Sequence, residues 1–196
     1  MPLRLDYRII EDHISPGARV LDVGCGDGAL MAELIEEKDV SGQGIDADSA
    51  QVCECIARGL PVYHGDMLEG MAMFVDDAFD CVILSQTLQQ TLSPAEAVSE
   101  MLRVGRRAII SFPNFGYWRV RLQLLLRGRM PVTPDLPYTW YDTPNIHLLT
   151  IKDFQAFCRE RELRVLDRIF LSRRGGRLPP ILGNLLATTA IFVIER

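Results

Sequence analysis

One short stretch constrains the fold of this chain more than any other. Residues 20–28 read VLDVGCGDG, a strand-like apolar run that enters a glycine-rich loop just before an amphipathic segment. Glycine permits positive φ and lets a ligand approach the backbone closely. The N–H groups that begin a helix can hold an anionic group such as a carboxylate. The stretch therefore predicts a strand, a ligand-binding loop and a helix in succession.

Apolar runs of strand length alternate with amphipathic stretches through the first half of the chain. The pattern predicts strands at residues 18–23, 42–46, 61–64, 79–84 and 107–112. It predicts helices at residues 28–37, 48–58, 71–75 and 94–103, the second with Asp48 or Ser49 as its N-cap. This order implies parallel strands with right-handed crossovers, and ligands on such sheets bind at the carboxyl ends of the strands.

After residue 114 the alternation stops. Residues 117–127 predict an amphipathic helix with a broad apolar face made of Leu122, Leu124, Leu125 and Leu126. Residues 128–146 predict an ordered loop, which carries Pro131, Pro134, Pro137 and Pro144 and the aromatic residues Tyr138, Trp140 and Tyr141. Two interpretations stay open: these groups cover a substrate pocket or anchor a partner protein, or they pack onto the chain's own core.

The C-terminal third returns to regular structure. A helix is expected over residues 150–161, with Thr150 as its N-cap and Asp153 at its third position. Strands are expected at residues 165–171 and 187–194, joined by a connection rich in Gly, Pro and Arg. The sequence thus predicts a single Rossmann-like α/β domain over residues 1–196, with a mainly parallel seven-stranded sheet and helices on both faces. Its predicted parts are a ligand-binding core (18–112), an inserted helix and aromatic, proline-rich loop (115–147), and a C-terminal helix and strand pair (148–196).

Composition excludes several classes of protein. The chain has 196 residues, 48% hydrophobic and 24% charged, as expected of one globular domain. No run of about 18 apolar residues predicts a membrane span, and the N-terminus lacks the apolar core of a signal peptide. Five cysteines, an odd number, favour reduced thiols and a cytoplasmic location. Three scattered histidines predict no metal site.

Charge divides unevenly along the chain. Residues 1–100 hold 5 Lys and Arg against 19 Asp and Glu, whereas residues 101–196 hold 16 against 7. A basic half can contact nucleic acid, but it can equally pair with the acidic half or face an acidic protein partner. Because no nucleic-acid motif accompanies the arginines, we expect neither a nucleic-acid partner nor a membrane partner.

Three acids follow three consecutive predicted strands. Asp22 ends the first strand inside the glycine loop, Asp46 ends the second, and Asp66 follows the third. A carboxylate at the first place can accept from a ligand ammonium, at the second from both ribose hydroxyls, and at the third from an adenine amino group. S-adenosylmethionine carries all of these groups. The expected cofactor contacts are Asp22, Gly24, Cys25, Gly26, Gly28, Asp46, Ala47, Asp66, Met67 and Ser85.

The glycine loop and Asp46 alone are also compatible with NAD, because dinucleotide-binding domains use a similar turn and ribose-binding acid. The spacing here is Gly-x-Gly-x-Gly rather than Gly-x-Gly-x-x-Gly. That difference and the third acid favour S-adenosylmethionine or S-adenosylhomocysteine over NAD.

Residues 18–112 resemble the class I S-adenosylmethionine-dependent methyltransferases in their glycine loop, Asp46, Gly65-Asp66 and the strand DCVILS at residues 80–85. Four further motifs resemble one family more narrowly, that of the methionine biosynthesis protein MetW. These motifs are LSQTLQ (84–89), MLRVGRR (101–107), SFPNFG (111–116) and TPNIH (143–147). The resemblance implies a class I methyltransferase fold and a role together with homoserine O-acyltransferase. It does not specify the oligomeric state, and a homo-oligomer is compatible with it.

Cofactor binding does not establish methyl transfer, which also needs an aligned acceptor and often a general base. Many small-molecule methyltransferases carry an acid and a histidine after the fourth strand, where this chain has Gln89 and Gln90. Glutamine is not a useful base. His147 is the remaining candidate, in a loop expected to overhang the pocket, although a lone loop histidine more often holds its loop by hydrogen bonds.

Three functional hypotheses follow. The first is an accessory protein of methionine biosynthesis that binds S-adenosylmethionine and supports or regulates homoserine O-acyltransferase. The second is an active S-adenosylmethionine-dependent methyltransferase that acts on a small metabolite. The third is an NAD-dependent oxidoreductase. The unfilled catalytic positions favour the first, and the sequence leaves the methyl acceptor and the partner's acyl donor, acetyl or succinyl, undetermined.

Overall fold

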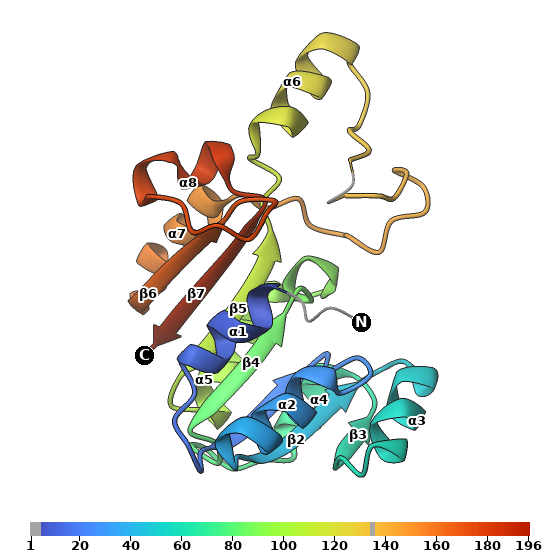
Figure 1. The fold of residues 1–196 in the computed structure, drawn as a ribbon, viewed down its shortest axis with the longest axis vertical. Helices are drawn as coiled ribbons and strands as arrows, with labels where there is room; N and C mark the ends of the chain where they lie inside the picture. The colour runs from blue at the N-terminus through green and yellow to red at the C-terminus, as the bar shows by residue number, and fades with distance from the viewer. Residues whose placement is uncertain (1–4, 134–135) are drawn as a thin grey trace.

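The computed structural model describes residues 5–133 and 136–196, and within them helices flank one seven-stranded sheet (Figure 1). The strands are β1 (Arg19–Val23), β2 (Ser41–Asp46), β3 (Val62–His64), β4 (Cys81–Ser85), β5 (Ala108–Pro113), β6 (Arg164–Leu171) and β7 (Thr189–Glu195). The helices are α1 (Leu5–Asp12), α2 (Ala29–Lys38), α3 (Ser49–Ala57), α4 (Met67–Ala72), the 3-10 helix η1 (Leu88–Gln90), α5 (Pro94–Val104), α6 (Trp118–Arg127), α7 (Ile151–Glu160) and α8 (Pro180–Leu186).

The strand order is β3-β2-β1-β4-β5-β7-β6. The five strands from β3 to β5 are parallel, and β7 lies antiparallel between β5 and β6. The predicted mainly parallel seven-stranded sheet is therefore confirmed. The direction of winding reverses between β1 and β4, which is where sheets of this kind bind ligands at their carboxyl edge.

Alternate residues of the strands from β1 through β4, β5 and β7 to β6 enter two separate cores. Leu21 and Val23 of β1 join one cluster, whereas Val20 joins the other, as the two-residue period of a strand requires. Helices α1 and α2 cover the face with Val20, and α4, α5 and α7 cover the opposite face. The sheet is thus buried on both sides, which explains the continuous apolar runs of its central strands.

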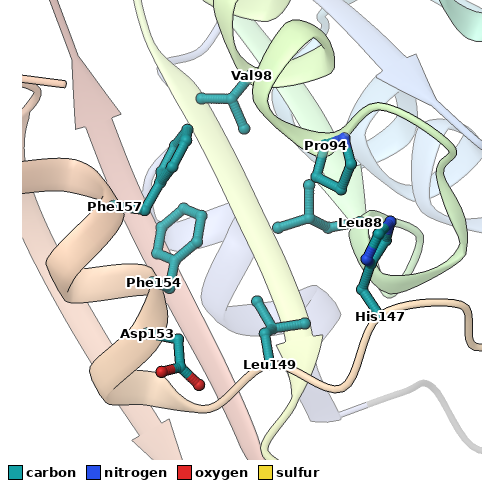
Figure 2. A pocket seen from close by; sticks show the side chains of 8 residues that line it. All are labelled: Leu88, Pro94, Val98, His147, Leu149, Asp153, Phe154 and Phe157. Atoms are coloured by element: carbon teal, nitrogen blue, oxygen red, sulfur yellow. The ribbon is translucent and has the colours of Figure 1, made fainter. Parts of the chain in front are cut away.

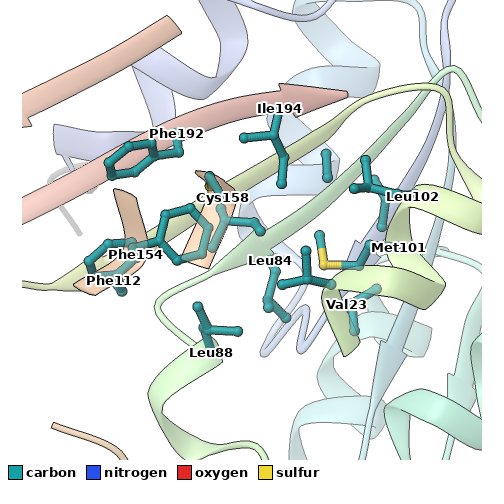
Figure 3. Close-up of a cluster of buried hydrophobic side chains, with 14 of the residues drawn as sticks. Val23, Leu84, Leu88, Met101, Leu102, Phe112, Phe154, Cys158, Phe192 and Ile194 are labelled. Atoms are coloured by element: carbon teal, nitrogen blue, oxygen red, sulfur yellow. The ribbon is translucent and has the colours of Figure 1, made fainter. Parts of the chain in front are cut away.

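An aromatic group links the C-terminal elements to the core (Figure 3). The rings of Phe112 in β5 and Phe154 in α7 have their centroids 5.1 Å apart, and those of Phe154 and Phe192 in β7 are 4.8 Å apart. Aromatic rings at such distances contribute more than their buried area alone. The last helix and strand pair therefore belong to the same core as the parallel strands.

Two predicted helix starts are confirmed. The Asp48 carboxylate accepts a hydrogen bond from the backbone N–H of Ala50 at 2.8 Å and caps α3. Thr150 and Asp153 form a reciprocal capping box at the start of α7, with Asp153 Oδ2 accepting from the Thr150 N–H at 2.9 Å. Both pairs satisfy backbone donors that a helix start leaves without intrahelical partners.

The predicted helical turn at residues 71–75 is wrong. Helix α4 begins four residues earlier, because Asp66 caps it by accepting hydrogen bonds from the backbone N–H groups of Leu68 and Glu69. Met73 and Val75, two apolar residues of the predicted turn, are exposed. The connection predicted between the last two strands also contains a helix, α8, which begins at Pro180, where proline fits the first turn.

The predicted helix at 117–127 is confirmed as α6, but its apolar face is not buried. Val120 is its one buried residue, and all four predicted leucines are exposed. Tyr138, Trp140 and Tyr141 are exposed as well, so the interpretation that they pack onto the chain's own core is wrong. Pro134 lies outside the described residues.

None of the helices in residues 5–133 and 136–196 is both long and apolar enough to span a bilayer.

Candidate functional site

The glycine loop between β1 and α2 has the backbone conformation that only glycine adopts without strain. Gly24, Gly26 and Gly28 have φ values of 69°, 56° and 75°. A Cβ at Gly24 would stand 2.7 Å from the Thr87 side chain, and one at Gly28 would collide with Leu60 and Cys55. Both positions therefore need glycine for space as well as for φ.

Asp46 holds this loop against the end of β2. Its Oδ2 accepts a hydrogen bond from the Gly26 N–H at 2.7 Å, and its Oδ1 accepts one from the Asp48 N–H at 2.9 Å. The Gly24 and Cys25 N–H groups both donate to the Ile45 carbonyl. Each carboxylate oxygen can accept a second hydrogen bond, so Asp46 remains able to receive ligand hydroxyls.

Cys25 and Cys55 pack beneath the loop. Their Sγ atoms are 3.8 Å apart, and the Cys55 thiol donates to the Gly26 carbonyl at 3.1 Å. Burial raises the pKa of both thiols above its usual range. The two cysteines are thus neutral packing groups, and neither has the properties of a nucleophile.

A cavity of about 640 Å³ opens at the carboxyl ends of β1, β2 and β3, within the range of volumes that hold small-molecule ligands. Half of the ten predicted contacts line it, namely Gly24, Asp46, Ala47, Asp66 and Met67. The acids at the carboxyl ends of β2 and β3 therefore do meet in one site. The other five, Asp22, Cys25, Gly26, Gly28 and Ser85, lie outside its lining.

Asp66 has a structural task that the sequence pattern did not predict. Both of its N-cap hydrogen bonds, at 2.8 and 3.4 Å, end on Oδ1. Its Oδ2 accepts no hydrogen bond from the described residues and stays available to a ligand. The same carboxylate thus fixes the start of α4 and presents an acceptor beside Met67 in the cavity wall.

Asp22 and Ser85 are buried, and neither lines the cavity. Asp22 is 2% exposed, and its charge contributes to the raised pKa of Cys25. Ser85 Oγ donates to Asp6 Oδ2 at 3.2 Å and lies 3.2 Å from Ser111 Oγ. Sequence reasoning missed Asp6, which reaches the ends of β4 and β5 from α1, because nothing in the local pattern connects an N-terminal helix with those strands.

Sequence reasoning also missed the wall formed by η1 and the start of α5, which contributes Thr87, Gln90, Thr91, Leu92, Ser93 and Ala97 to the cavity. Gln89, by contrast, is buried, and its Nε2 donates to the Gln86 carbonyl at 2.6 Å. This wall offers hydroxyl and amide groups to a ligand, and none of these groups is a general base at neutral pH.

His147 does not overhang this cavity. It lines a separate apolar pocket of about 200 Å³ between α5 and α7, beside Leu88 and Pro94 (Figure 2). Its backbone N–H donates to the Gln89 carbonyl at 3.0 Å, which fixes the loop. Its ring Nε2 is buried and has no hydrogen-bond partner among the described residues. The structure thus separates the one candidate base from the predicted cofactor residues.

We expect the His147→Leu variant to unfold at a higher temperature than the wild type. A buried polar atom without a partner costs about 1–3 kcal/mol, and leucine fills an apolar pocket without that cost. Thermal unfolding followed by circular dichroism measures the shift, with His64→Leu as the control, because His64 is exposed. A large loss of stability would show that the imidazole makes a bond that this structure lacks.

The remaining histidines lie elsewhere. His13 bonds to Asp167 at 2.9 Å, and His64 lies 3.3 Å from the Ala47 carbonyl. Within the described residues no three His, Cys, Asp or Glu side chains gather into a metal-binding group.

Comparison with known proteins identifies the architecture and the family. Over 97% of its length the chain superposes with a TM-score of 0.69 on 94% of an S-adenosylmethionine-dependent methyltransferase from Archaeoglobus fulgidus, at 14% identity. This likeness establishes the class I methyltransferase fold. Over 54% of its length the chain is also 33% identical to a ubiquinone biosynthesis O-methyltransferase from Hahella chejuensis, of which it covers 45%.

A bifunctional methionine biosynthesis protein MetXA/MetW from Rhodopirellula baltica is 35% identical over 99% of this chain. The chain spans only 33% of that longer protein. The family model of the methionine biosynthesis protein MetW matches residues 4–194. Since the match covers almost the whole sequence, the chain belongs to the MetW family of methionine biosynthesis proteins.

Proposed function

We propose that this chain binds S-adenosylmethionine, or its product S-adenosylhomocysteine, and serves as an accessory or regulatory partner of homoserine O-acyltransferase. The observation that carries the first part is the convergence of Gly24 of the glycine loop, Asp46, Asp66 and Met67 on one cavity of about 640 Å³. The second part follows from membership of the MetW family and from a relative that joins MetXA and MetW in one polypeptide.

The residues present fit this cofactor. Asp46, Asp66 and Met67 all line the cavity. In this proposal Asp46 accepts hydrogen bonds from both ribose hydroxyls, and Asp66 Oδ2 and Met67 bind the adenine ring. Gly24, Cys25, Gly26 and Gly28 give the loop the shape that admits the methionine end, beside the helix start of α2. Asp22 and Ser85 are buried outside the cavity lining, and we propose that the negative charge of Asp22 attracts the ligand ammonium from there. Ala47 completes the ribose side.

The proposed partnership has a physical rationale in the fused relative. Joining two units in one chain holds them at a high effective concentration, which is useful only where the units act together. A homoserine O-acyltransferase encoded as a separate chain must then recognise this protein through a surface. Bound S-adenosylmethionine regulates the partner if it binds the free and assembled forms with different affinities.

An active methyltransferase that acts on a small metabolite is the second candidate, favoured by the similarity to ubiquinone biosynthesis O-methyltransferases. Against it stand two features of the site. Gln90 and hydroxyl groups form the wall where an acid or imidazole would be needed, and His147 lies in a different pocket.

The free thiols of all five cysteines lead us to infer a reducing compartment, the cytoplasm.

The test is homoserine acylation by the purified acyltransferase of the same organism, with and without this chain. We expect addition of the chain to raise the rate at least about fivefold, and S-adenosylmethionine titrated into the assay to change that rate further. Acylation that is indifferent to the chain would refute the partnership. Radiolabelled methyl transfer to an added metabolite would then support the second candidate. A binding assay that asks whether NAD displaces S-adenosylhomocysteine tests the third hypothesis, an NAD-dependent oxidoreductase. We expect NAD not to displace it.

A further inference from the structure

Helix α6 stands apart from the rest of the molecule. Figure 1 shows it projecting beyond the end of β5, away from the helices that cover the sheet. Val120 is its one buried residue, so the helix contributes almost nothing to either core. A helix usually acquires its stability from burying an apolar face, and α6 leaves most of its apolar surface in solvent.

The exposed apolar residues of α6 form a stripe. Trp118, Leu122, Leu125 and Leu126 occupy positions i, i+4, i+7 and i+8, which lie on one side of a helix. Their exposed fractions are 38, 42, 81 and 73%. Val120 lies two positions from both Trp118 and Leu122 and five positions from Leu125. In an α-helix these separations put Val120 on the side opposite the stripe, toward the domain. Contiguous apolar surface of this kind marks an interaction site.

The base of the helix is fixed. Arg121 donates from Nε to the Gly116 carbonyl at 2.5 Å and from Nη2 to the Asn184 carbonyl at 3.2 Å. The Asn114 side chain donates to the Ala187 carbonyl at 2.9 Å and accepts from the Gly116 N–H. These bonds attach α6 to α8 and β5, so the stripe is presented in a set orientation. Preorganised surfaces lose less entropy on binding.

Charge restricts what can cover the stripe. Residues 118–129 contain four arginines and no acid. Arg119 lies over the Trp118 ring, and neither Arg127 nor Arg129 forms an ion pair with the described residues. Arg119 borders the stripe, whereas Arg127 lies seven positions after Val120 and therefore on the other side of the helix. Two copies packed through the stripe would still place these uncompensated positive charges close together, which disfavours a second copy of this chain as the occupant. The complementary surface is an apolar groove with an acidic rim.

The position of α6 relates it to the cofactor site. The helix follows the carboxyl end of β5, at the same edge of the sheet as the cavity at the ends of β1, β2 and β3. A protein that covers the stripe therefore binds at the edge where the ligand binds.

We propose that the stripe formed by Trp118, Leu122, Leu125 and Leu126 is the surface through which this chain docks on homoserine O-acyltransferase, in an apolar groove rimmed by acids. The proposal rests on the partnership proposed above and names the surface that makes it. The arginines of residues 119–129 steer the encounter through their combined positive charge, and the leucines and Trp118 supply the buried contact.

The test compares the full-length chain with a Leu125→Ser/Leu126→Ser variant by biolayer interferometry on immobilised acyltransferase. The matched control is Ile56→Ser/Val75→Ser, which removes two exposed apolar groups from α3 and from the loop after α4. We expect the α6 variant to bind about 30-fold more weakly and the control to bind like the wild type. Both variants should bind S-adenosylhomocysteine like the wild type, which shows that they are folded.

A second variant tests the charges. Arg127→Glu/Arg129→Glu should slow association, and high ionic strength should slow association of the wild type in the same direction. An association rate that both changes leave unaltered would overturn the electrostatic part of the proposal.

The outcomes separate the two proposals. A wild-type chain that fails to bind the acyltransferase contradicts the proposed function itself. A wild-type chain that binds, with an α6 variant that binds equally well, overturns only the docking surface. If the Leu125→Ser/Leu126→Ser change instead abolishes self-association in sedimentation, or binding to vesicles of phosphatidylcholine and phosphatidylglycerol, while acyltransferase binding persists, the stripe serves a second copy or a membrane surface.

Discussion

Replacing Asp46 by asparagine is expected to weaken the binding of S-adenosylhomocysteine by about 100-fold. Hydrogen bonds to a charged acceptor contribute about 1.5–3 kcal/mol each, and an asparagine oxygen loses the charge and offers only one carbonyl where the carboxylate offers two oxygens. Two ribose hydroxyls therefore lose about 3 kcal/mol together, which is about a 100-fold change in the dissociation constant. Isothermal titration calorimetry measures it directly.

The same substitution has a second effect, because Asp46 also accepts from the Gly26 and Asp48 N–H groups. Thermal unfolding must therefore accompany the titration. Asp39→Asn is the matched control, since Asp39 is an exposed acid in the left-handed region, which asparagine tolerates. If Asp46→Asn binds the ligand like the wild type, the assignment of this cavity to the ribose is wrong.

The acids that meet in the cavity could be predicted because each lies at or just beyond the end of a strand. Asp46 ends β2 and Asp66 comes two residues after β3, and the carboxyl ends of these neighbouring parallel strands share one edge. The glycine loop was equally predictable, since its φ values and lack of side-chain space admit little but glycine. Local sequence determines these features, and the sheet only brings them together.

The rest depends on tertiary contacts that no local pattern contains. His147 belongs to a loop whose course is fixed by the Gln89 carbonyl, more than fifty residues earlier in the chain, and that bond places it in a separate pocket. Asp6 lies in the N-terminal helix α1 and accepts a hydrogen bond from Ser85, which is far away in the sequence. Helix α6 has the periodicity of a buried amphipathic helix, and periodicity alone does not distinguish a face that meets the chain's own core from one that meets another protein.

Replacing Gly28 by alanine is expected to lower stability by about 3 kcal/mol. A residue with a Cβ is destabilised by about 1–2 kcal/mol in the left-handed region, and overpacking adds about 1–3 kcal/mol of destabilisation. The overpacking arises because the new methyl group would meet Leu60 Cδ1 and would stand 2.9 Å from Cys55 Sγ. For a chain of this length the melting temperature should fall by about 8 °C, which differential scanning calorimetry measures.

Gly59 separates the two causes. Its φ of 76° is nearly that of Gly28, but a Cβ there meets no atom within 4 Å. Gly59→Ala therefore lowers the stability only through the backbone conformation, by about 1 kcal/mol, and the melting temperature should fall by about 3 °C. The difference between the two variants measures how tightly Leu60 and Cys55 pack under the glycine loop. Equal losses of stability in both variants would show that Leu60 and Cys55 move aside for the new methyl group. The loop would then need glycine at residue 28 for its φ and not for the space beneath it.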